Sequence, residues 1–343
     1  MSERTELDEL GEFGLIDRLN PKREIRNQST ILGIGDDAAA LEYKDKLVLV
    51  STDALVEGIH FDMVYTPLKH LGYKACVINF SDIYAMNGRP KQITVTISVS
   101  NRFSLQALEE LYSGIHLACE KYNVDLVGGD TTSSNSGLFI SITVIGEVEK
   151  EKMVTRSGAK VNDLICVTGD LGGAYAGLLV LQREKAGFLA NPNIQPDFSA
   201  YEYILERQLK PEAQRETIEW FEENGIMPTS MIDISDGLAS ETLHICNNSQ
   251  VGCELYIDKF PIDFESARTL EEFNIMPDVG ALNGGEDYEL LFTIDQKDYE
   301  KCKSNQNISI IGHITDISLG RNLVTPQDTT IELRARGWNH FKN

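Results

Sequence analysis

Apolar and polar residues follow two periodicities along this chain, and together they predict both strands and helices. The predicted strands of the first half are the β-rich runs at residues 47–54, 92–99, 124–130 and 138–148. Pro67 begins a helical apolar pattern that ends at Gly88-Arg89-Pro90, and Ser104 is the predicted N-cap of a second helix. The first half is therefore predicted to be an α/β domain.

A charged run at residues 147–152, "EVEKEK", predicts a domain boundary, after which the pattern restarts. A strand is expected at 163–170 and a proline-containing loop at 186–200. Later strands are expected in "GCELYID", "YELLFTI" and "ISIIGHI". In some predicted strands apolar and polar residues alternate, whereas other strands are continuously apolar. We therefore expect an α/β fold of the α+β type with mixed sheets. The two expected domains are residues 1–150 and 151–343.

Composition narrows the class of protein. The 343 residues include 53 acidic and 31 basic side chains, for a formal net charge of −22, which argues against nucleic acid or an anionic membrane as a partner. No apolar run approaches the roughly 20 residues of a membrane helix, and the first residues lack the apolar core of a secretion signal. The six cysteines form no CxxC pair, which indicates buried thiols in a reducing compartment. We expect a cytoplasmic protein.

Carboxylates gather at predicted strand ends and in turns, several of them beside glycine. These acids are Asp36, Asp37, Asp53, Asp82, Asp130, Asp233, Asp236, Glu286 and Asp287. Ser51, Thr52 and Ser235 place hydroxyl groups beside some of them. Carboxylate and hydroxyl oxygens are the ligands that Mg²⁺ accepts. Adjacent carboxylates such as those in "GIGDDAA" repel each other unless they face water or a cation lies near them.

Turn chemistry is the alternative explanation for these acids. A single Asp-Gly or Gly-Asp pair is typical of a turn, and Asp236 is placed as well for a helix N-cap as for a metal ligand. The number of acidic turns and their spread over both halves favour a site for several divalent ions. Asp36 and Asp37, adjacent in the sequence, either both face water or lie beside a bound cation. The ions would supply positive charge that a phosphate substrate needs.

Three familiar phosphate and metal motifs are missing from the sequence. The chain has no GxxxxGK[ST] loop, no His-Arg-Asp catalytic loop and no HExxH pair. These absences argue against P-loop enzymes, protein kinases and the common zinc hydrolases. The glycine-rich stretch "GDLGGAYAG" at 169–177 lacks a following lysine, and it predicts a closely packed helix start.

Eight short motifs occur in a fixed order between about residues 11 and 341: "GIGDDAA", "STDALVEGIHF", "SDIYAMNGRP", "GGDTTSS", "RSGAK", "DISDGLA", "GGEDYELLFT" and "RGWNHF". In this order they resemble thiamine-monophosphate kinases, which belong to the ATP-using superfamily typified by aminoimidazole ribonucleotide synthetase. The resemblance implies a two-domain PurM-like architecture and a cytoplasmic homodimer whose N-terminal sheets pair across the dimer. It also implies that the N-terminal domain binds ATP and Mg²⁺, and that ATP phosphorylates thiamine monophosphate to thiamine diphosphate.

The resemblance also implies roles for individual residues. The implied magnesium ligands are Asp36, Ser51, Thr52, Asp53, Asp82, Asp130, Asp233 and Asp236. The implied ATP contacts are Tyr112, Gly129, Asp130, Arg156 and Ser235. The implied contacts to the thiamine substrate are His60, Glu286 and Trp338. The segment "LKPEAQRE" departs from the proline- and arginine-rich pattern common in the family, and its Lys210 and Arg215 either meet phosphate or lie on a solvated helix start.

The reaction expected from this resemblance is direct in-line transfer without a phosphoenzyme. The acceptor is an ionised phosphate oxygen, so no general base is required. Two alternatives stay open: another ATP-using member of the superfamily, such as a selenophosphate or aminoimidazole ribonucleotide synthetase-like enzyme, and a non-catalytic acidic protein that binds divalent metal. The first cysteine, Cys76, lies inside a predicted helix and not beside an N-terminal glycine-rich loop, which disfavours a selenophosphate synthetase.

Overall fold

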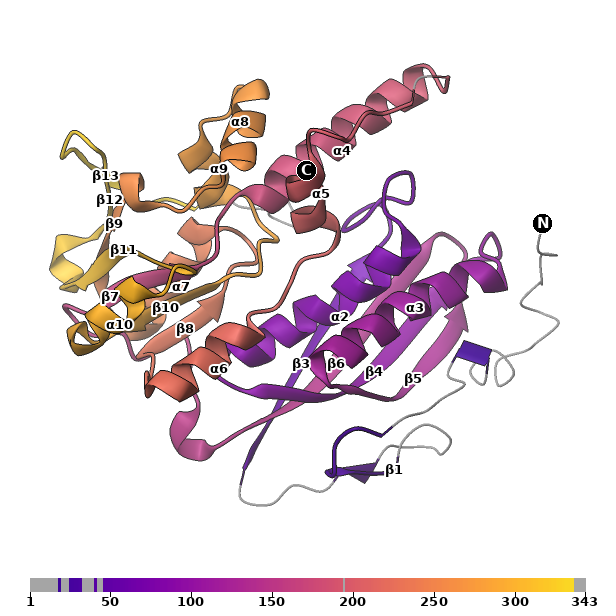
Figure 1. Cartoon of the computed structure of the whole chain (residues 1–343), viewed down its shortest axis with the longest axis horizontal. Helices are drawn as coiled ribbons and strands as arrows, with labels where there is room; N and C mark the ends of the chain where they lie inside the picture. Colours follow the sequence, from indigo (N-terminus) through magenta and orange to yellow (C-terminus); the bar gives the residue numbers. More distant parts are fainter. Residues whose placement is uncertain (1–17, 20–24, 33–39, 42–45, 194, 336–343) are drawn as a thin grey trace. The chain divides into compact units, whose positions relative to one another are not determined.

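A computed structural model of the chain describes residues 18–19, 25–32, 40–41, 46–193 and 195–335 (Figure 1). The chain divides into two compact units, Met1–Tyr84 with Gly88–Glu151 and Ala85–Asn87 with Lys152–Asn343. Three residues for which the sequence predicts a role, Asp36, Asp37 and Trp338, lie outside the described residues.

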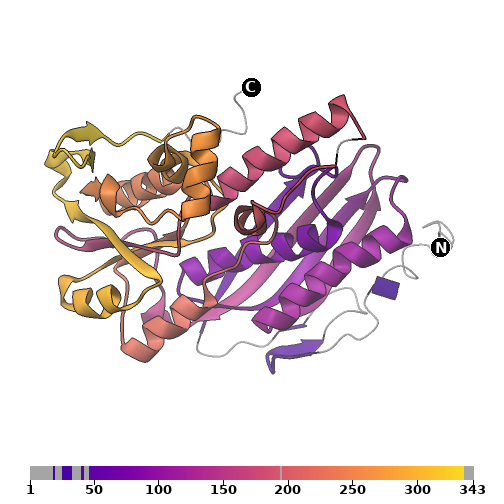
Figure 2. The same cartoon turned by 45° about the horizontal axis from the view of Figure 1, so that its top comes forward.

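The first unit contains a four-stranded sheet with the strand order β3-β6-β4-β5 (Figures 1 and 2). Its strands are β3 (Leu47–Val56), β4 (Arg89–Val99), β5 (Asp125–Ser133) and β6 (Leu138–Val148). Only β4 and β5 are parallel neighbours in this sheet. Helices α2 (Leu68–Ala85) and α3 (Leu105–Tyr122) cover one face, and β1 (Thr30–Leu32) pairs with β2 (Ala40–Leu41) separately. The strands and helices predicted for this half are confirmed.

Two glycines set how closely α2 and α3 pack. A Cβ atom on Gly72 would lie 2.0 Å from the Leu111 carbonyl oxygen, and one on Gly114 would lie 1.8 Å from the Lys69 carbonyl oxygen. No side chain fits at such distances, so the two helix backbones are in direct contact at this crossing. Because α2 also carries Asp82, the crossing helps to fix the position of a predicted metal ligand.

The second unit is built on a seven-stranded sheet with the order β13-β12-β9-β11-β7-β10-β8. Its strands are β7 (Leu164–Thr168), β8 (Ser230–Asp233), β9 (Gly252–Tyr256), β10 (Leu290–Ile294), β11 (Ile308–Thr315), β12 (Arg321–Val324) and β13 (Thr330–Glu332). Its helices are α4 (Gly173–Ala190), α5 (Glu202–Leu209), α6 (Arg215–Asn224), α7 (Leu238–Ser249), α8 (Phe264–Glu272), α9 (Pro277–Asn283) and α10 (Tyr299–Ser304). β9 and β12 are parallel neighbours among antiparallel ones, which confirms the predicted mixed sheet.

Helix α4 corrects one prediction. The sequence predicts a loop over residues 186–200, whereas α4 continues to Ala190. Gly187 alone weakens a helix without ending it, and the first proline of the segment, Pro192, comes only after Ala190. Neither α4 nor any other helix in the described part of the chain is long and apolar enough to cross a membrane.

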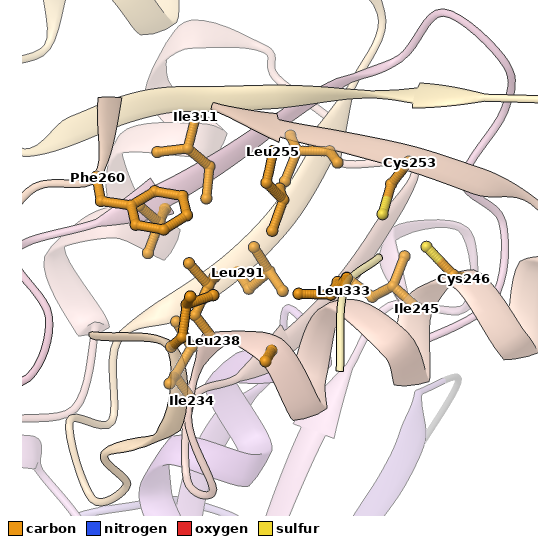
Figure 3. Close-up of a cluster of buried hydrophobic side chains, with 14 of the residues drawn as sticks. Ile234, Leu238, Ile245, Cys246, Cys253, Leu255, Phe260, Leu291, Ile311 and Leu333 are labelled. Atoms are coloured by element: carbon orange, nitrogen blue, oxygen red, sulfur yellow. The ribbon is translucent and has the colours of Figure 1, made fainter. Parts of the chain in front are cut away.

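The core of the second unit lies between the sheet and α7 (Figure 3). Leu238 and Ile245 of α7 are buried in one cluster with Leu255, Leu291 and Ile311 of the sheet. Burying such a side chain contributes about 1.5–3 kcal/mol relative to leaving it in water. The connection from β8 to α7 is therefore anchored by the core, and this connection carries three of the predicted site residues.

The α2–α3 crossing gives the first prediction. Gly114→Ala should lower the free energy of unfolding of the first unit by about 1–3 kcal/mol, because its Cβ must push the α2 backbone away. The matched control is Gly187→Ala in α4, where an added Cβ meets nothing within 4 Å. This control should be neutral or stabilising, since alanine is the better helix former. Urea denaturation of both variants measures the difference, and equal effects would contradict the close crossing.

Candidate functional site

Three predicted magnesium ligands of the first unit lie together between β3 and α2. The Ser51 hydroxyl donates to Asp82 Oδ2 at 2.5 Å, and the Asp53 amide donates to Asn79 Oδ1 at 3.1 Å. Asn79 and Asp82 are three residues apart on α2 and so share the helix face that meets the strand. Burial, with the nearby Asp82 charge, raises the pKa of Asp53 to about 6. Two close carboxylates with a hydroxyl form an oxygen-rich cluster that favours a cation.

The sheet places two further predicted ligands on its opposite face. Thr52 pairs with Thr143 across β3 and β6, and the Thr143 hydroxyl donates to the Thr52 hydroxyl at 3.0 Å. Asp130 pairs with Thr96, and the register places both on the Thr52 face. In addition, β3 and β5 are the two edge strands of this sheet. A single copy of the first unit therefore does not bring Asp130 to the cluster of Ser51, Asp53 and Asp82.

The other predicted residues of the first unit have well-defined surroundings. His60 Nδ1 accepts a hydrogen bond from the Val56 amide at 3.0 Å, so the ring closes the turn that follows β3. Tyr112 is buried on α3, and burial raises the pKa of its hydroxyl to about 12. Gly129 has no room for a side chain, because an added Cβ would lie 1.8 Å from the Val95 carbonyl oxygen.

In the second unit, the turn between β8 and α7 carries three predicted residues. Asp233 is buried at the end of β8, whereas Ser235 and Asp236 are exposed. The Asp236 amide donates to Oε1 of Glu241 at 3.0 Å, from the first turn of α7. Burial, with the charges of Asp236 and Asp233, raises the pKa of Glu241 to about 8. Sequence reasoning missed Glu241, because an acid in the first turn of a helix is typical of an ordinary solvated helix start.

Glu286, a predicted substrate contact, lies directly beside this turn. Its amide donates to the Ser235 carbonyl oxygen at 2.8 Å, and its side chain accepts a hydrogen bond from Gln208 Nε2 at 2.7 Å. Its φ of 67° is in the left-handed region that non-glycine residues seldom adopt. Gly285 is required next to it, because a Cβ there would lie 2.3 Å from the Ser235 carbonyl oxygen. The structure thus brings Ser235, Asp236 and Glu286 together.

The other acids of "GGEDYE" face inward. Asp287 accepts hydrogen bonds from the Gly172 and Ala174 amides, at 2.8 and 3.3 Å, at the start of α4. Burial raises the pKa of Asp287 to about 7 despite these bonds and the nearby Arg207. Arg207 Nη1 donates to Glu289 Oε1 at 2.8 Å. Asp287 and Glu289 are therefore structural anchors. Arg207, which holds them, was not identified from the sequence, where it appears as one more charge on a short helix.

The remaining predicted cations lie at the surface. Lys210 pairs with Glu206 at 3.2 Å, and Arg215 pairs with Glu219 at 2.8 Å. These i,i+4 pairs are typical of a solvated helix. Arg156 is exposed. Among the described side chains, no three of the types His, Cys, Asp and Glu are arranged as a metal site.

Comparisons with known proteins show what the chain is similar to. A family model for "AIR synthase related protein, N-terminal domain" matches residues 35–148. The chain is 33% identical over 339 residues to the thiamine-monophosphate kinase of Bacillus subtilis, a match that covers 97% of this chain and 100% of the relative.

Two solved structures resemble the whole chain. One is AaThiL complexed with AMPPCP and TMP, with a TM-score of 0.74 and 31% identity, covering 99% of this chain and 100% of that one. The other is thiamine-monophosphate kinase from Stenotrophomonas maltophilia K279a, with a TM-score of 0.78 and 30% identity, covering 95% of this chain and 98% of that one.

The inward-facing acids generate a prediction about pH. Between about pH 4 and 7 the folded chain keeps the Asp287 proton that the unfolded chain loses, so the unfolding free energy should fall as the pH rises. Asp287 alone contributes at most about 1.4 kcal/mol per pH unit. Burial also raises the pKa of Glu289 and of Asp170, which adds to the same trend. Urea denaturation at pH 5, 6 and 7 without metal measures the slope. Asp287→Asn should make the slope smaller without abolishing it, because Glu289 and Asp170 still contribute, and stability that rises with pH in the wild type would contradict the buried network.

Proposed function

Because the chain belongs to the thiamine-monophosphate kinase family, we propose that it transfers the terminal phosphoryl group of ATP to thiamine monophosphate. The products are ADP and thiamine diphosphate. The observation that carries this proposal is 33% identity along almost the entire length of a thiamine-monophosphate kinase. The structure titled AaThiL complexed with AMPPCP and TMP gives further support, since it matches both units of this chain.

The charge of the reactants is the main obstacle in this reaction. Two unit charges about 4 Å apart repel by about 4 kcal/mol at an effective dielectric of about 20, and each reactant carries more than one charge. The acceptor is already an ionised oxygen, so the chain has no proton to remove. The catalytic requirement is to neutralise and align two phosphate groups, which suits direct in-line transfer.

The side chains present fit a magnesium requirement. Ser51, Asp53 and Asp82 offer only oxygen atoms. Burial and, after it, the Asp82 charge raise the pKa of Asp53, and a divalent cation would offset that neighbouring charge. In the second unit, Asp233 and Asp236 offer two further carboxylates at one turn. Bound Mg²⁺ screens phosphate charge and polarises the transferred group. We assign these five residues to metal binding, together with Thr52, Asp130 and Asp36.

The two substrates are assigned to separate sets of residues. The proposed ATP contacts are Tyr112, Gly129, Asp130, Arg156 and Ser235. The proposed contacts to thiamine monophosphate are His60, Glu286 and Trp338. Support comes from the pairing of the Glu286 and Ser235 main chains, which places a proposed substrate residue beside a proposed nucleotide residue in the second unit.

A homodimer in the cytoplasm is part of the proposal. Strand β3 is an edge strand of ten residues, and its Val48 and Val50 are 43% and 65% exposed. An exposed apolar edge strand is a surface that proteins normally cover, and pairing with the first unit of a second copy would cover it. All six cysteines are buried free thiols, which suits a reducing compartment.

Incubation of the purified chain with ATP, Mg²⁺ and thiamine monophosphate tests the activity. Thiamine diphosphate and ADP should form in equal amounts, and omission of Mg²⁺ should abolish both. ADP formation only with another acceptor would favour a different member of the superfamily. Absence of ATP turnover with bound divalent metal would favour a metal-binding protein without catalysis.

The acid cluster of the first unit gives a prediction for turnover. Asp82→Asn should lower kcat by at least about 100-fold, because it removes a charged metal ligand while leaving the side-chain volume unchanged. Folding should survive, since removing one of two close carboxylates relieves repulsion. Glu110→Gln, at an exposed acid on α3, is the matched control. Near-normal turnover in Asp82→Asn would remove Asp82 from the metal site.

Trp338 gives a prediction for substrate binding. Trp338→Ala should raise the KM for thiamine monophosphate by about 10-fold and leave the KM for ATP within about twofold, since an aromatic side chain contributes mainly to the organic ring that it contacts. Trp220→Ala, at the other tryptophan of the chain, should change neither KM. Equal increases in both KM values would place Trp338 outside the substrate pocket.

A further inference from the structure

Glu241 is a buried acid without an assigned role. It lies in the first turn of α7 and is 2% exposed, between core residues such as Leu238 and Ile245 on the same helix. Its Oε1 accepts the hydrogen bond from the Asp236 amide at 3.0 Å. Its Oε2 has no hydrogen-bond partner among the described residues. Burying an apolar side chain at this position would cost less free energy than burying a carboxyl group, which indicates that the carboxyl group has a specific role.

Main-chain bonds tie Ile234 and Ser235 to the 286–289 loop, whereas the next residue, Asp236, makes its bond to Glu241. Gly237, the N-cap of α7, has a φ of 107° and provides no side-chain cap. On the other side of the turn, the Glu286 amide donates to the Ser235 carbonyl oxygen. The exposed pair Ser235 and Asp236 is thus held by one main-chain bond from the Glu286 loop and by one bond to Glu241 from beneath.

We propose that Glu241 is the positioning residue of this turn. By holding the Asp236 amide from the buried side, it fixes the direction in which the exposed Ser235 and Asp236 side chains face. This inference rests on the proposed function only in what those two side chains bind, namely a nucleotide phosphate and its divalent ion. The physical reason is that a turn ending at a flexible glycine is held in one conformation when its main-chain groups are bonded on both sides.

Three variants separate positioning from simple stability. Glu241→Met keeps the length and the apolar contacts but removes the acceptor. Glu241→Gln keeps an acceptor oxygen for the Asp236 amide. Thr242→Val is the matched control, because it removes a different buried hydrogen bond of α7, from the Thr242 hydroxyl to the Leu238 carbonyl oxygen at 2.7 Å. If Glu241→Met does not fold, Glu241→Asp replaces it, since one methylene less withdraws the carboxyl from the amide.

Two readouts that need no turnover test the variants. The first is hydrogen exchange of the peptide containing Asp236. The second is the affinity for Mn²⁺ in the presence of AMPPCP, measured from water-proton relaxation. Glu241→Met should exchange faster at this peptide and bind Mn²⁺ about 10-fold more weakly, because a small misplacement of a ligand is costly. Glu241→Gln should behave as the wild type in both, and Thr242→Val should lose stability without weakening Mn²⁺ binding.

Each other outcome overturns the inference. Unchanged Mn²⁺ affinity in Glu241→Met would show that Glu241 serves stability alone. An equal loss in Glu241→Gln would show that the charge matters and the acceptor does not. Failure of the proposed kinase activity is seen separately, as a wild-type chain that forms no thiamine diphosphate while the Mn²⁺ measurements proceed unaffected.

Discussion

The second unit depends on the hydrogen-bonded pairing of two loops that are about fifty residues apart in the sequence. The main chain of Ile234 and Ser235 pairs with the main chain at 286–289, and Gly285 permits the approach because a Cβ there would lie 2.3 Å from the Ser235 carbonyl oxygen. Because main-chain atoms make this pairing, it leaves the Ser235 hydroxyl and the Glu286 carboxylate out of its own bonds, and the Glu286 carboxylate accepts a hydrogen bond from Gln208 Nε2. A nucleotide residue and a substrate residue of the proposed reaction are thereby held in a fixed relation.

A buried ion network around Arg207 contacts the loop that takes part in this pairing. Arg207 contacts Glu289 and Asp287, while Asp287 accepts the first amides of α4. A buried ion network of this kind is weak as a source of stability, because removing charges from water costs about as much as their attraction returns. The network instead fixes how three segments are positioned. Arg207 of α5 contacts Glu289 and Asp287 in the loop before β10, and Asp287 bonds the start of α4.

In the first unit, the alternation of side chains along β3 places neighbouring predicted metal ligands on opposite faces of the sheet. Ser51 and Asp53 face α2 and Asp82, whereas Thr52 faces the other side of the sheet with Asp130. The implied magnesium ligands of this unit therefore form two groups on two faces, and one copy of the sheet does not unite them. The exposed Val48 and Val50 of β3 lie on this second face with Thr52.

The sequence by itself determined the strands and helices of the first half, the mixed sheet of the second, and the oxygen-rich character of the predicted site. Periodicity and turn chemistry are local properties, so they can be recognised without contacts. Only the tertiary structure decided that Glu286 lies beside Ser235 while Asp287 and Glu289 are buried. The sequence alone does not distinguish these three acids, because they occur within four consecutive positions. Arg207 and Glu241 could not be found for the same reason. Arg207 matters because it is buried beside partners 37 and 82 positions away, and Glu241 matters because it bonds the Asp236 amide from within the core.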